Sequence, residues 1–350
     1  MFFSSKKIIG VDLGTSSIKM CELSVHKNGT ATLENFSFAM TPDEALSNNE
    51  IVNALLIGEV IKSGLKDSKF GRKHACVGMW GTAAMVKKIS MPKVDPKGLR
   101  EQIKYEAQQY LPFEISQVTL EHHVLPFASQ SDYMDVLIIA GQNEFITKYK
   151  EVIGYAGLKA TILDVSCLAF ANLFEFNYGK LNEPVALFNF GKTSTQFIVV
   201  FRGEVIFARD IPVGGFHFTN EISKSMGVTL EEAESLKISG TSTKENPEGT
   251  RTSMDVAIDY VTEEVKNSIE FYTTSGGDLQ ITKAFFTGGA SLTVGLIDHL
   301  RSELKLNFEE INPLLKIQTS NKRLNSQYLK EIAPFMAVSL GLGLRQDGDS

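Results

Sequence analysis

A short strand–turn–strand segment that occurs twice constrains the fold of this chain more than any other feature. The first copy is residues 11–17, with sequence VDLGTSS, and the second is residues 188–194, with sequence FNFGKTS. Each copy ends an apolar run in a polar turn, and residues 18–23 and 196–201 then continue as stretches typical of strands. This pattern predicts two hairpins. Similar hairpins so far apart indicate two similar halves.

Both predicted hairpin tips combine glycine with small hydroxyl side chains. Such a tip presents free backbone amides and lacks the bulk that would keep a ligand away. This combination suits a phosphate cradle, and two such cradles could face each other. Each turn alone is weak evidence, because Asp-x-Gly-Thr turns also occur for purely conformational reasons.

Between the two hairpins, the hydrophobic pattern predicts a separate unit. Strands are expected at residues 84–91, 119–127, 134–141 and 158–164, and helices at residues 96–111 and 144–156. The resulting order, βαββαβ, is typical of a ferredoxin-like fold. We therefore expect an inserted subdomain in this part of the chain.

Charge and hydropathy disfavour several classes of function. The 35 Lys and Arg residues against 41 Asp and Glu give a net charge of −6, so no basic field attracts nucleic acid. The longest apolar stretch, residues 332–344, contains Pro334 and is shorter than the ~20 residues of a membrane-spanning helix. Three cysteines without metal-ligand spacing indicate reduced thiols and a cytosolic protein. We expect no nucleic-acid partner and no direct membrane insertion.

The order of the glycine-rich turns resembles that of the nucleotide-binding motifs in the superfamily of actin, DnaK-type chaperones and sugar kinases. Residues 9–19 (IGVDLGTSSIK) resemble its first phosphate loop, residues 189–194 (NFGKTS) the second, and residues 286–291 (FTGGAS) the adenosine loop. Residues 165–173 and 334–344 resemble its two connecting helices. The resemblance implies an α/β, actin-like ATPase fold with two duplicated domains around a nucleotide cleft.

This resemblance also implies how the chain is divided. The first actin-like domain would comprise residues 1–80, 164–182 and 335–350. The second would comprise residues 183–334 and carry the adenosine-binding elements. Residues 81–163 would form the inserted ferredoxin-like βαββαβ subdomain.

Several further segments are similar to the bacterial FtsA and PilM branch of this superfamily. They are residues 211–215 (IPVGG), 218–222 (FTNEI) and 232–237 (EAESLK). Residues 90–92 (SMP), 99–103 (LREQI) and 106–113 (EAQQYLPF) are similar to the PilM family of type IV pilus assembly. In this branch a Glu and a Lys of one helix approach the adenosine, and Glu234 and Lys237 match them. Their i, i+3 spacing places both on one helix face, as it would in a simple exposed ion pair.

The resemblance implies a set of residues that bind ATP and magnesium. Amides and hydroxyls of both phosphate loops would donate to phosphate oxygens, with Lys19 or Lys192 adding positive charge. Asp12 would hold Mg²⁺ through water, as this hard cation prefers. Glycines of the adenosine loop would let the backbone lie against the adenine. The residues expected to bind nucleotide are Asp12, Gly14, Thr15, Ser16, Ser17, Lys19, Asn189, Gly191, Lys192, Thr193, Ser194, Gly214, Gly215, Glu234, Lys237, Gly288, Gly289 and Ala290.

Two departures from the superfamily pattern predict weak or absent ATP hydrolysis. Asn189 stands where the second phosphate loop usually has an Asp, and a neutral amide neither attracts magnesium as strongly nor orients water as a base. The acidic residue often found at the start of the first connecting helix has only Asp164 as a nearby counterpart. Asp164 is therefore a possible catalytic residue, and no base is securely placed.

The resemblance to the PilM family implies an ATP-binding cytoplasmic adaptor, peripheral to the inner membrane, in the type IV pilus assembly complex. Such an adaptor would capture the N-terminal tail of the inner-membrane protein PilN in a groove and connect pilus assembly to the cytoplasmic motor. Other platform and motor proteins, and self-association, are further expected contacts. We expect the groove near Leu99, Ile103 and Tyr110. Alternatively, these three side chains pack the core of the inserted subdomain.

Two other functions belong to the same superfamily. An FtsA-like filament protein of cell division would bind the membrane through an amphipathic C-terminal helix, whereas residues 343–350 (GLRQDGDS) are polar and acidic. A sugar kinase would need a substrate-facing Asp between the halves, and a chaperone-type ATPase would need a further peptide-binding domain. The sequence offers neither, so we prefer the adaptor function.

Overall fold

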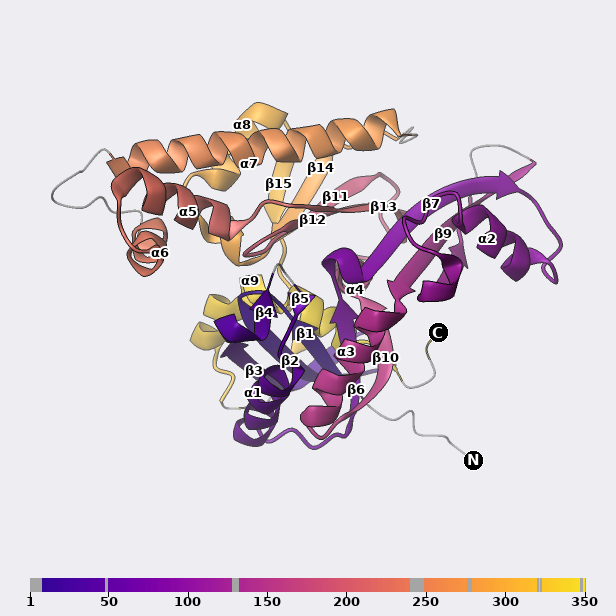
Figure 1. Cartoon of the computed structure of the whole chain (residues 1–350), viewed down its shortest axis with the longest axis horizontal. Coiled ribbons are helices and arrows are strands. Elements are labelled where there is room, and N and C mark those ends of the chain that lie inside the picture. The colour runs from indigo at the N-terminus through magenta and orange to yellow at the C-terminus, as the bar shows by residue number, and fades with distance from the viewer. Residues whose placement is uncertain are drawn as a thin grey trace.

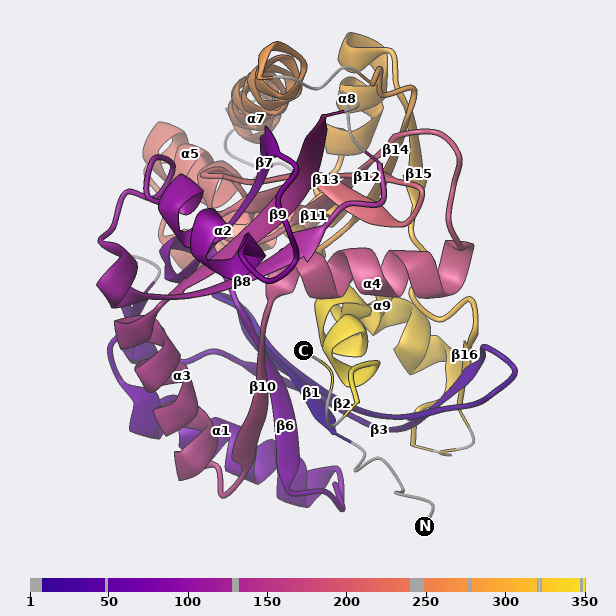
Figure 2. The ribbon, with the colours of Figure 1, turned by 90° about the vertical axis from the view of Figure 1, so that its right-hand side faces the viewer.

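The computed structural model of the chain describes residues 8–47, 50–127, 132–239, 249–275, 279–319, 321, 323–346 and 349. Two large sheets with helices around them form the two halves of the molecule, and a smaller sheet stands beside both (Figures 1 and 2). The described helices are α1 (Ala54–Asp67), α2 (Leu99–Ala107), α3 (Asn143–Tyr155), α4 (Ser166–Tyr178), α5 (Gly215–Met226), α6 (Leu230–Ser239), α7 (Gly249–Thr274), α8 (Leu296–Leu304) and α9 (Ser326–Gly343). None of these helices is both long and apolar enough to cross a membrane.

The first sheet contains the first of the two predicted hairpins. Its strands are β1 (Ile9–Leu13), β2 (Ser17–Val25), β3 (Ala31–Met40), β6 (His74–Met79), β10 (Lys159–Val165) and β16 (Ile317–Gln318), in the order β10-β6-β1-β2-β3-β16. β1 pairs antiparallel with β2 and parallel with β6. Because α1 and α3 cover one face and α4 and α9 the other, every residue of β1 is buried.

The second sheet repeats this arrangement. Its strands are β11 (Val185–Phe190), β12 (Thr195–Phe201), β13 (Glu204–Ile211), β14 (Lys283–Thr287) and β15 (Asn307–Glu310), in the order β13-β12-β11-β14-β15. β11 pairs antiparallel with β12 and parallel with β14, as β1 does with β2 and β6. α7 and α8 cover its outer face, and α4 covers the inner one (Figure 1). The two similar halves predicted from the repeated hairpin are therefore confirmed.

Glycines permit close packing of the helices and strands at the centre of the molecule. α4 and α9 lie side by side between the two sheets (Figure 2). A Cβ on Gly341 of α9 would lie 1.9 Å from the carbonyl oxygen of Ala169 in α4. A Cβ on Gly10 of β1 would lie 2.3 Å from the carbonyl oxygen of Ser339. Only glycine permits these approaches, which bring α9 close to β1 and to α4.

The inserted subdomain is smaller than predicted. Its strands are β7 (Ala84–Pro92), β8 (Val118–Val124) and β9 (Tyr133–Gln142), in the order β7-β9-β8, with α2 packed on one face. The expected βαββαβ order of elements is present, but β10 pairs with β6 of the first sheet, and α3 packs with α1. The physical reason is the larger core of the first half, which buries Phe145, Tyr149, Val152 and Ile153 of α3.

β16 also belongs to the first half, although we predicted this part of the chain in the second. β16 lies within the segment expected in the second domain, yet it pairs with β3 in the first sheet. α9, which follows it, packs on β1 and β2 of that sheet. A separate two-stranded ribbon, β4 (Leu46–Ser47) with β5 (Glu50–Ile51), precedes α1.

The face of the inserted sheet opposite α2 contacts the second half. The amide of Gly81 donates to Asp210 Oδ2 at 3.0 Å, at the end of β13. His123 Nε2 lies 2.8 Å from Glu204 Oε2, and the rings of Phe127 and Phe201 meet edge to face at 5.3 Å. The inserted subdomain is thus joined covalently to the first half and by side-chain contacts to the second.

Candidate nucleotide-binding site

The tips of the two repeated hairpins have the same local structure and face each other. The amide of Gly14 donates to the carbonyl oxygen of Ser17 at 3.1 Å, and the amide of Gly191 donates to that of Ser194 at 2.9 Å. The hydroxyl oxygens of Thr15 and Thr193 are 3.2 Å apart across the gap between the halves. Two turns rich in backbone amides and hydroxyls therefore meet at one place, joined by the hydrogen bond between Thr15 and Thr193.

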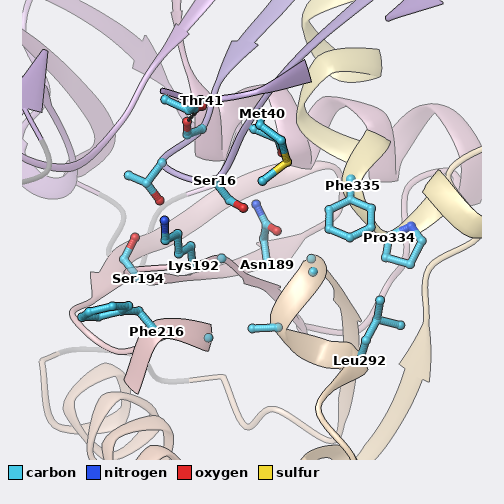
Figure 3. Close-up of a pocket in the computed structure, with 18 of the residues that line it drawn as sticks. Ser16, Met40, Thr41, Asn189, Lys192, Ser194, Phe216, Leu292, Pro334 and Phe335 are labelled. Atoms are coloured by element: carbon cyan, nitrogen blue, oxygen red, sulfur yellow. Dashed lines mark hydrogen bonds between the residues drawn. The ribbon is translucent and has the colours of Figure 1, made fainter. Parts of the chain in front are cut away.

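A cavity of about 1160 Å³ opens beside these tips, between the two halves. Figure 3 shows Ser16 and Thr41 of the first half on one side of it and Asn189, Lys192 and Ser194 of the second half on the other. Of the residues predicted to bind nucleotide, sixteen line the cavity: Asp12, Gly14, Thr15, Ser16, Ser17, Lys19, Asn189, Gly191, Lys192, Ser194, Gly215, Glu234, Lys237, Gly288, Gly289 and Ala290. Thr193 and Gly214 do not line it.

The two hairpins differ in charge at equivalent positions behind their tips. Asp12 and Lys19 are cross-strand neighbours, and Asp12 Oδ2 lies 2.8 Å from Lys19 Nζ. The same register in the second hairpin pairs Asn189 with Gln196, and Asn189 Nδ2 donates to Gln196 Oε1 at 3.0 Å. A buried ion pair in one half thus corresponds to a pair of neutral amides in the other.

This donor set is suited to a nucleotide that brings its own magnesium ion. Asp12 is the buried carboxylate among the cavity-lining residues, since Asp43 and Glu231 are exposed and Glu234 is half exposed. Mg²⁺ commonly keeps most of its waters and uses substrate phosphates and one or two carboxylates. Asp12 fits that role, with Lys19 beside it to offset part of the phosphate charge.

Glycines at the back of the cavity allow the backbone to approach closely. A Cβ on Gly288 would lie 2.4 Å from the carbonyl oxygen of Phe190, and Gly288 adopts a φ of 99°, which favours glycine. A Cβ on Gly214 would lie 2.4 Å from the carbonyl oxygen of Gly191. Gly214 therefore supports the second hairpin tip from behind, although it does not line the cavity.

Lys237 and Glu234 connect α6 to α5 at the edge of the cavity. Lys237 is buried, and its Nζ donates to the carbonyl oxygen of Gly215 at 3.2 Å, to Thr219 Oγ1 at 3.1 Å and to Glu234 Oε2 at 2.7 Å. These bonds use the three protons of the ammonium group. Lys237 thus holds the helices together, and half-exposed Glu234 is the better placed of the two to meet a ligand.

Asp164, the possible catalytic residue, does not line the cavity. Its Oδ2 lies 3.5 Å from Arg345 Nη1, and its Oδ1 accepts a hydrogen bond from the amide of Val165 at 2.8 Å. Burial raises the pKa of this carboxyl above its ordinary value, and the charge of Arg345 opposes the rise. Asp164 is thus enclosed by its own partners, which corrects the expectation of a catalytic role.

Sequence reasoning missed the apolar wall of the cavity. Met40 of β3, Leu292 after the adenosine loop, and Pro334 and Phe335 of α9 belong to it (Figure 3). Phe38 of β3 lines the cavity as well. The rings of Phe38 and Phe335 meet edge to face at 5.5 Å. These residues come from three segments that are far apart in the sequence. Sequence reasoning missed them because an isolated apolar residue is not part of any recognisable motif. The adjacent Thr41 gives no signal either, although its hydroxyl donates to the carbonyl oxygen of Gly14 at 2.7 Å.

The three residues expected at the peptide groove do not form one surface. Ile103 is 1% exposed in the core of the inserted subdomain, and Leu99 is half-buried against the same core. Tyr110 is 38% exposed, with Lys87 Nζ 4.6 Å from the centre of its ring. The alternative, that these side chains pack the subdomain, is therefore correct for Ile103 and Leu99. Tyr110 is exposed and Leu99 is partly exposed, so Ile103 is the one of the three that is closed to a partner.

Duplicated halves around a cavity lined by facing hairpin tips define a protein of the actin-like ATPase fold. The ethanolamine utilization protein EutJ from Carboxydothermus hydrogenoformans has this fold, with 14% identity over 96% of this chain and 89% of that chain and a TM-score of 0.56. So does MreB5 of Spiroplasma citri bound to AMPPNP, with 13% identity over 93% of this chain and 98% of that chain and a TM-score of 0.52. These two likenesses concern the fold alone.

A more specific match comes from type IV pilus assembly. The solved PilM-PilN type IV pilus biogenesis complex contains a chain with 25% identity, over 97% of this chain and 98% of that one, and a TM-score of 0.84. A family model for the type IV pilus assembly protein PilM matches residues 10–347. The chain belongs to this PilM family and has a role in type IV pilus assembly.

Proposed function

We propose that this protein is an ATP-binding cytoplasmic adaptor of the type IV pilus assembly complex, located at the inner membrane through its partner. The observation that carries the nucleotide part is the contact of the two hairpin tips, with the hydroxyl oxygens of Thr15 and Thr193 3.2 Å apart. Amides and hydroxyls from both halves would surround the phosphates there, because each tip is a cradle of donors. The adenosine would lie toward Gly288, Gly289 and Glu234.

The nucleotide in this proposal is ATP with Mg²⁺. Asp12 would hold the ion through water, and Lys19 and Lys192 would add positive charge near the phosphates. The ion supplies neutralisation of phosphate charge when bound. Hydrolysis is expected to be slow or absent, because the second hairpin carries the amides of Asn189 and Gln196 and Asp164 is turned into its own ion pair.

The partner in this proposal is the N-terminal tail of PilN. The family membership and the similarity to the PilM-PilN complex support it. An extended tail would bind in a groove between the inserted subdomain and the first half, gaining main-chain hydrogen bonds and a few apolar anchors. Tyr110 is the exposed residue in our predicted set, and Leu99 is partly exposed. Through this contact the protein would connect membrane-bound assembly proteins to the cytoplasmic motor.

Calorimetric titration of the purified protein tests both parts of the proposal. ATP with Mg²⁺ is titrated first, into the wild type, into Asp12→Asn and into Asp255→Asn, whose side chain is exposed on α7. Asp12→Asn should weaken binding of ATP with Mg²⁺ by about tenfold, as expected for one charged hydrogen-bonding group. Asp255→Asn should behave as the wild type. If the wild type takes up no ATP, the nucleotide part of the proposal is wrong.

A synthetic PilN N-terminal peptide is then titrated with and without ATP and Mg²⁺. Binding in both conditions with different affinities supports a nucleotide-responsive adaptor. Equal affinities support an adaptor in which the nucleotide is a structural cofactor. Absence of peptide binding in both conditions contradicts the adaptor and favours a filament-forming, FtsA-like protein, which sedimentation in the presence of ATP would detect.

A further inference from the structure

We propose that one side of α2, with the residues that flank it, binds the surface of an anionic lipid bilayer. The exposed cations of this surface, which we call the basic face, are Lys87, Lys93, Lys97, Arg100 and Lys104. The inference rests on the proposed function, because the partner tail is what would bring this face to a membrane. It adds a direct electrostatic contact with lipid headgroups to the contact made through the partner.

The first observation is an uneven distribution of charge along the chain. Residues 87–104 contain six Lys and Arg residues against Asp95 and Glu101, which gives this stretch a net charge of +4. Since the whole chain carries −6, the rest of it carries −10. A positive patch on an otherwise acidic protein turns that patch, and no other side, toward a negative surface.

The second observation is where these cations lie. α2 packs on one face of the inserted sheet, and the opposite face contacts the second half. α2 therefore lies on the outside of the molecule, as both views show (Figures 1 and 2). Lys88, the sixth cation of the stretch, is half-buried and pairs with Asp135 at 3.4 Å. The other five cations are exposed to solvent.

The third observation is that the basic face follows α2 from one end to the other. Lys97 precedes the helix, and Arg100 and Lys104 lie on one side of it because they are four residues apart. At the other end, Lys87 Nζ lies 4.6 Å from the centre of the Tyr110 ring, just after the helix. The nine residues of α2 span about 14 Å. An extended patch of this kind suits a flat charged surface better than a small anion.

The fourth observation is that much of this charge is not neutralised within the protein. Lys87, Lys97 and Arg100 form no ion pair within the part of the chain that the structure describes. Lys104 pairs with Glu101 at 3.0 Å, but both side chains are exposed, and such a surface pair contributes little. With Asp95 and Glu101 counted against the five cations, the exposed surplus is three positive charges.

An exposed aromatic side chain lies among these cations. Tyr105 follows Lys104 directly and is 64% exposed, more than any other aromatic side chain among the described residues. Tyrosine is enriched at membrane–water interfaces, because its ring prefers the apolar side while its hydroxyl stays in water. The ring therefore favours a lipid surface over a soluble acidic protein as the partner of the basic face.

The lipid contact is expected to be weak alone and effective beside a bound partner. Each Lys or Arg near an anionic leaflet strengthens binding about fivefold. A membrane-bound tail that holds the protein near the bilayer makes the lipid contact intramolecular, which raises its effective concentration. The basic face would then also fix the orientation of the protein on the membrane.

Vesicle sedimentation tests the inference on the full chain. The vesicles contain one-third phosphatidylglycerol, which is anionic, in phosphatidylcholine, and vesicles of phosphatidylcholine alone give the background. One variant removes three cations of the basic face by combining Lys97→Gln, Arg100→Gln and Lys104→Gln. The matched control removes three exposed cations in and after α1, far from α2 in both views (Figures 1 and 2), by combining Lys62→Gln, Lys66→Gln and Lys69→Gln.

We expect the wild type to bind the anionic vesicles and the basic-face variant to lose at least tenfold in affinity, since each cation contributes about fivefold. The α1 variant should stay within about threefold of the wild type, because only its net charge changes. Raising the salt from about 0.1 M to about 1 M should abolish wild-type binding, because the Debye length falls from about 10 Å to about 3 Å. Equal loss in the two variants would overturn the inference, and so would equal wild-type binding to both kinds of vesicle.

A charge-retaining variant separates charge from side-chain packing. Lys97→Arg, Arg100→Lys and Lys104→Arg combined should bind the anionic vesicles as the wild type does, and a loss of binding there would contradict an electrostatic contact. Thermal unfolding shows whether each variant is folded. The proposed function is measured in solution without lipid, so it can fail independently. If the wild type binds ATP and the PilN peptide but not the anionic vesicles, the lipid contact is wrong while the proposed function stands.

Discussion

Gly214 shows at the scale of one residue how the second phosphate loop is held in place. Its backbone is extended, with φ −166°, so any residue could adopt its conformation. The restriction is spatial, because a Cβ would lie 2.4 Å from the carbonyl oxygen of Gly191 and 2.8 Å from that of Lys192. Both contacts are with backbone atoms, which cannot move aside as a flexible side chain can.

We therefore predict that Gly214→Ala displaces the second hairpin tip. It should weaken ATP binding at least tenfold and lower the free energy of unfolding by about 1–3 kcal/mol, as overpacked sites do. Gly154→Ala is the control, since Gly154 is exposed in α3 and a Cβ there would contact nothing within 4 Å. That change should raise stability by about 0.5–1 kcal/mol and leave ATP affinity unchanged. Equal ATP affinity in both variants would contradict this account.

At the scale of elements, α2 and the turn after it divide into buried and accessible positions. Ile103 lies in the core of the inserted subdomain, whereas Tyr105 and Tyr110 are 64% and 38% exposed. Tyr110 also contacts Lys87 of β7, which fixes the orientation of its ring. A partially buried, oriented aromatic side chain is a typical anchor for a bound peptide.

We predict that Tyr110→Ala weakens binding of the PilN peptide at least fivefold and changes the free energy of unfolding by less than about 1 kcal/mol. Tyr105→Ala provides the matched control, and it should leave peptide affinity unchanged because its ring stands in solvent. Ile103→Ala should instead lower the free energy of unfolding by about 2–5 kcal/mol. Calorimetry measures the peptide affinity, and chemical denaturation measures the free energy of unfolding. If Tyr105→Ala weakens peptide binding and Tyr110→Ala does not, the proposed position of the groove near Tyr110 is wrong.

The elements that sequence reasoning predicted best are those with local signals. The hairpins around Gly14 and Gly191 and the order of strands and helices between them follow from periodicity and turn residues, and the structure has both. Sequence reasoning could not tell which sheet β10 would join, because a strand of half-buried residues fits either sheet locally. β10 joins the first sheet because α3, which precedes it, packs against α1 in the core of the first half. This packing involves residues far apart in the sequence, so no local pattern predicts it.

The residues of the candidate site also differ in whether the local sequence predicts them. Gly288 and Gly289 were found because close backbone approach requires glycine, which leaves a readable pattern. Phe38 and Phe335 were missed because their meeting at the cavity depends on the packing of β3 beside α9. Asp164 was misassigned because Arg345, which covers its carboxylate, is far away in the sequence.

At the scale of the whole molecule, the inserted subdomain bridges the two halves that enclose the cavity. The chain joins it to the first half, while Phe127 and His123 contact Phe201 and Glu204 of the second half. A nucleotide that draws the halves together must therefore either carry the subdomain along or break these contacts. The proposed peptide groove and nucleotide cavity would thus be connected through these contacts, and coupling requires that each ligand bias them.

We predict that ATP with Mg²⁺ changes the affinity for the PilN peptide by a factor of about five or more, and that the peptide changes ATP affinity by the same factor, since coupling is reciprocal. Phe127→Ala, combined with Glu204→Gln, should bring both factors close to one while each ligand still binds alone. The control is Glu309→Gln, which breaks a comparable surface ion pair with Lys283 on the far edge of the second sheet. Four calorimetric titrations per variant complete the cycle. If the double variant keeps the wild-type coupling factor, the connection between the two sites runs through α4 and α9, the helices shared by both halves.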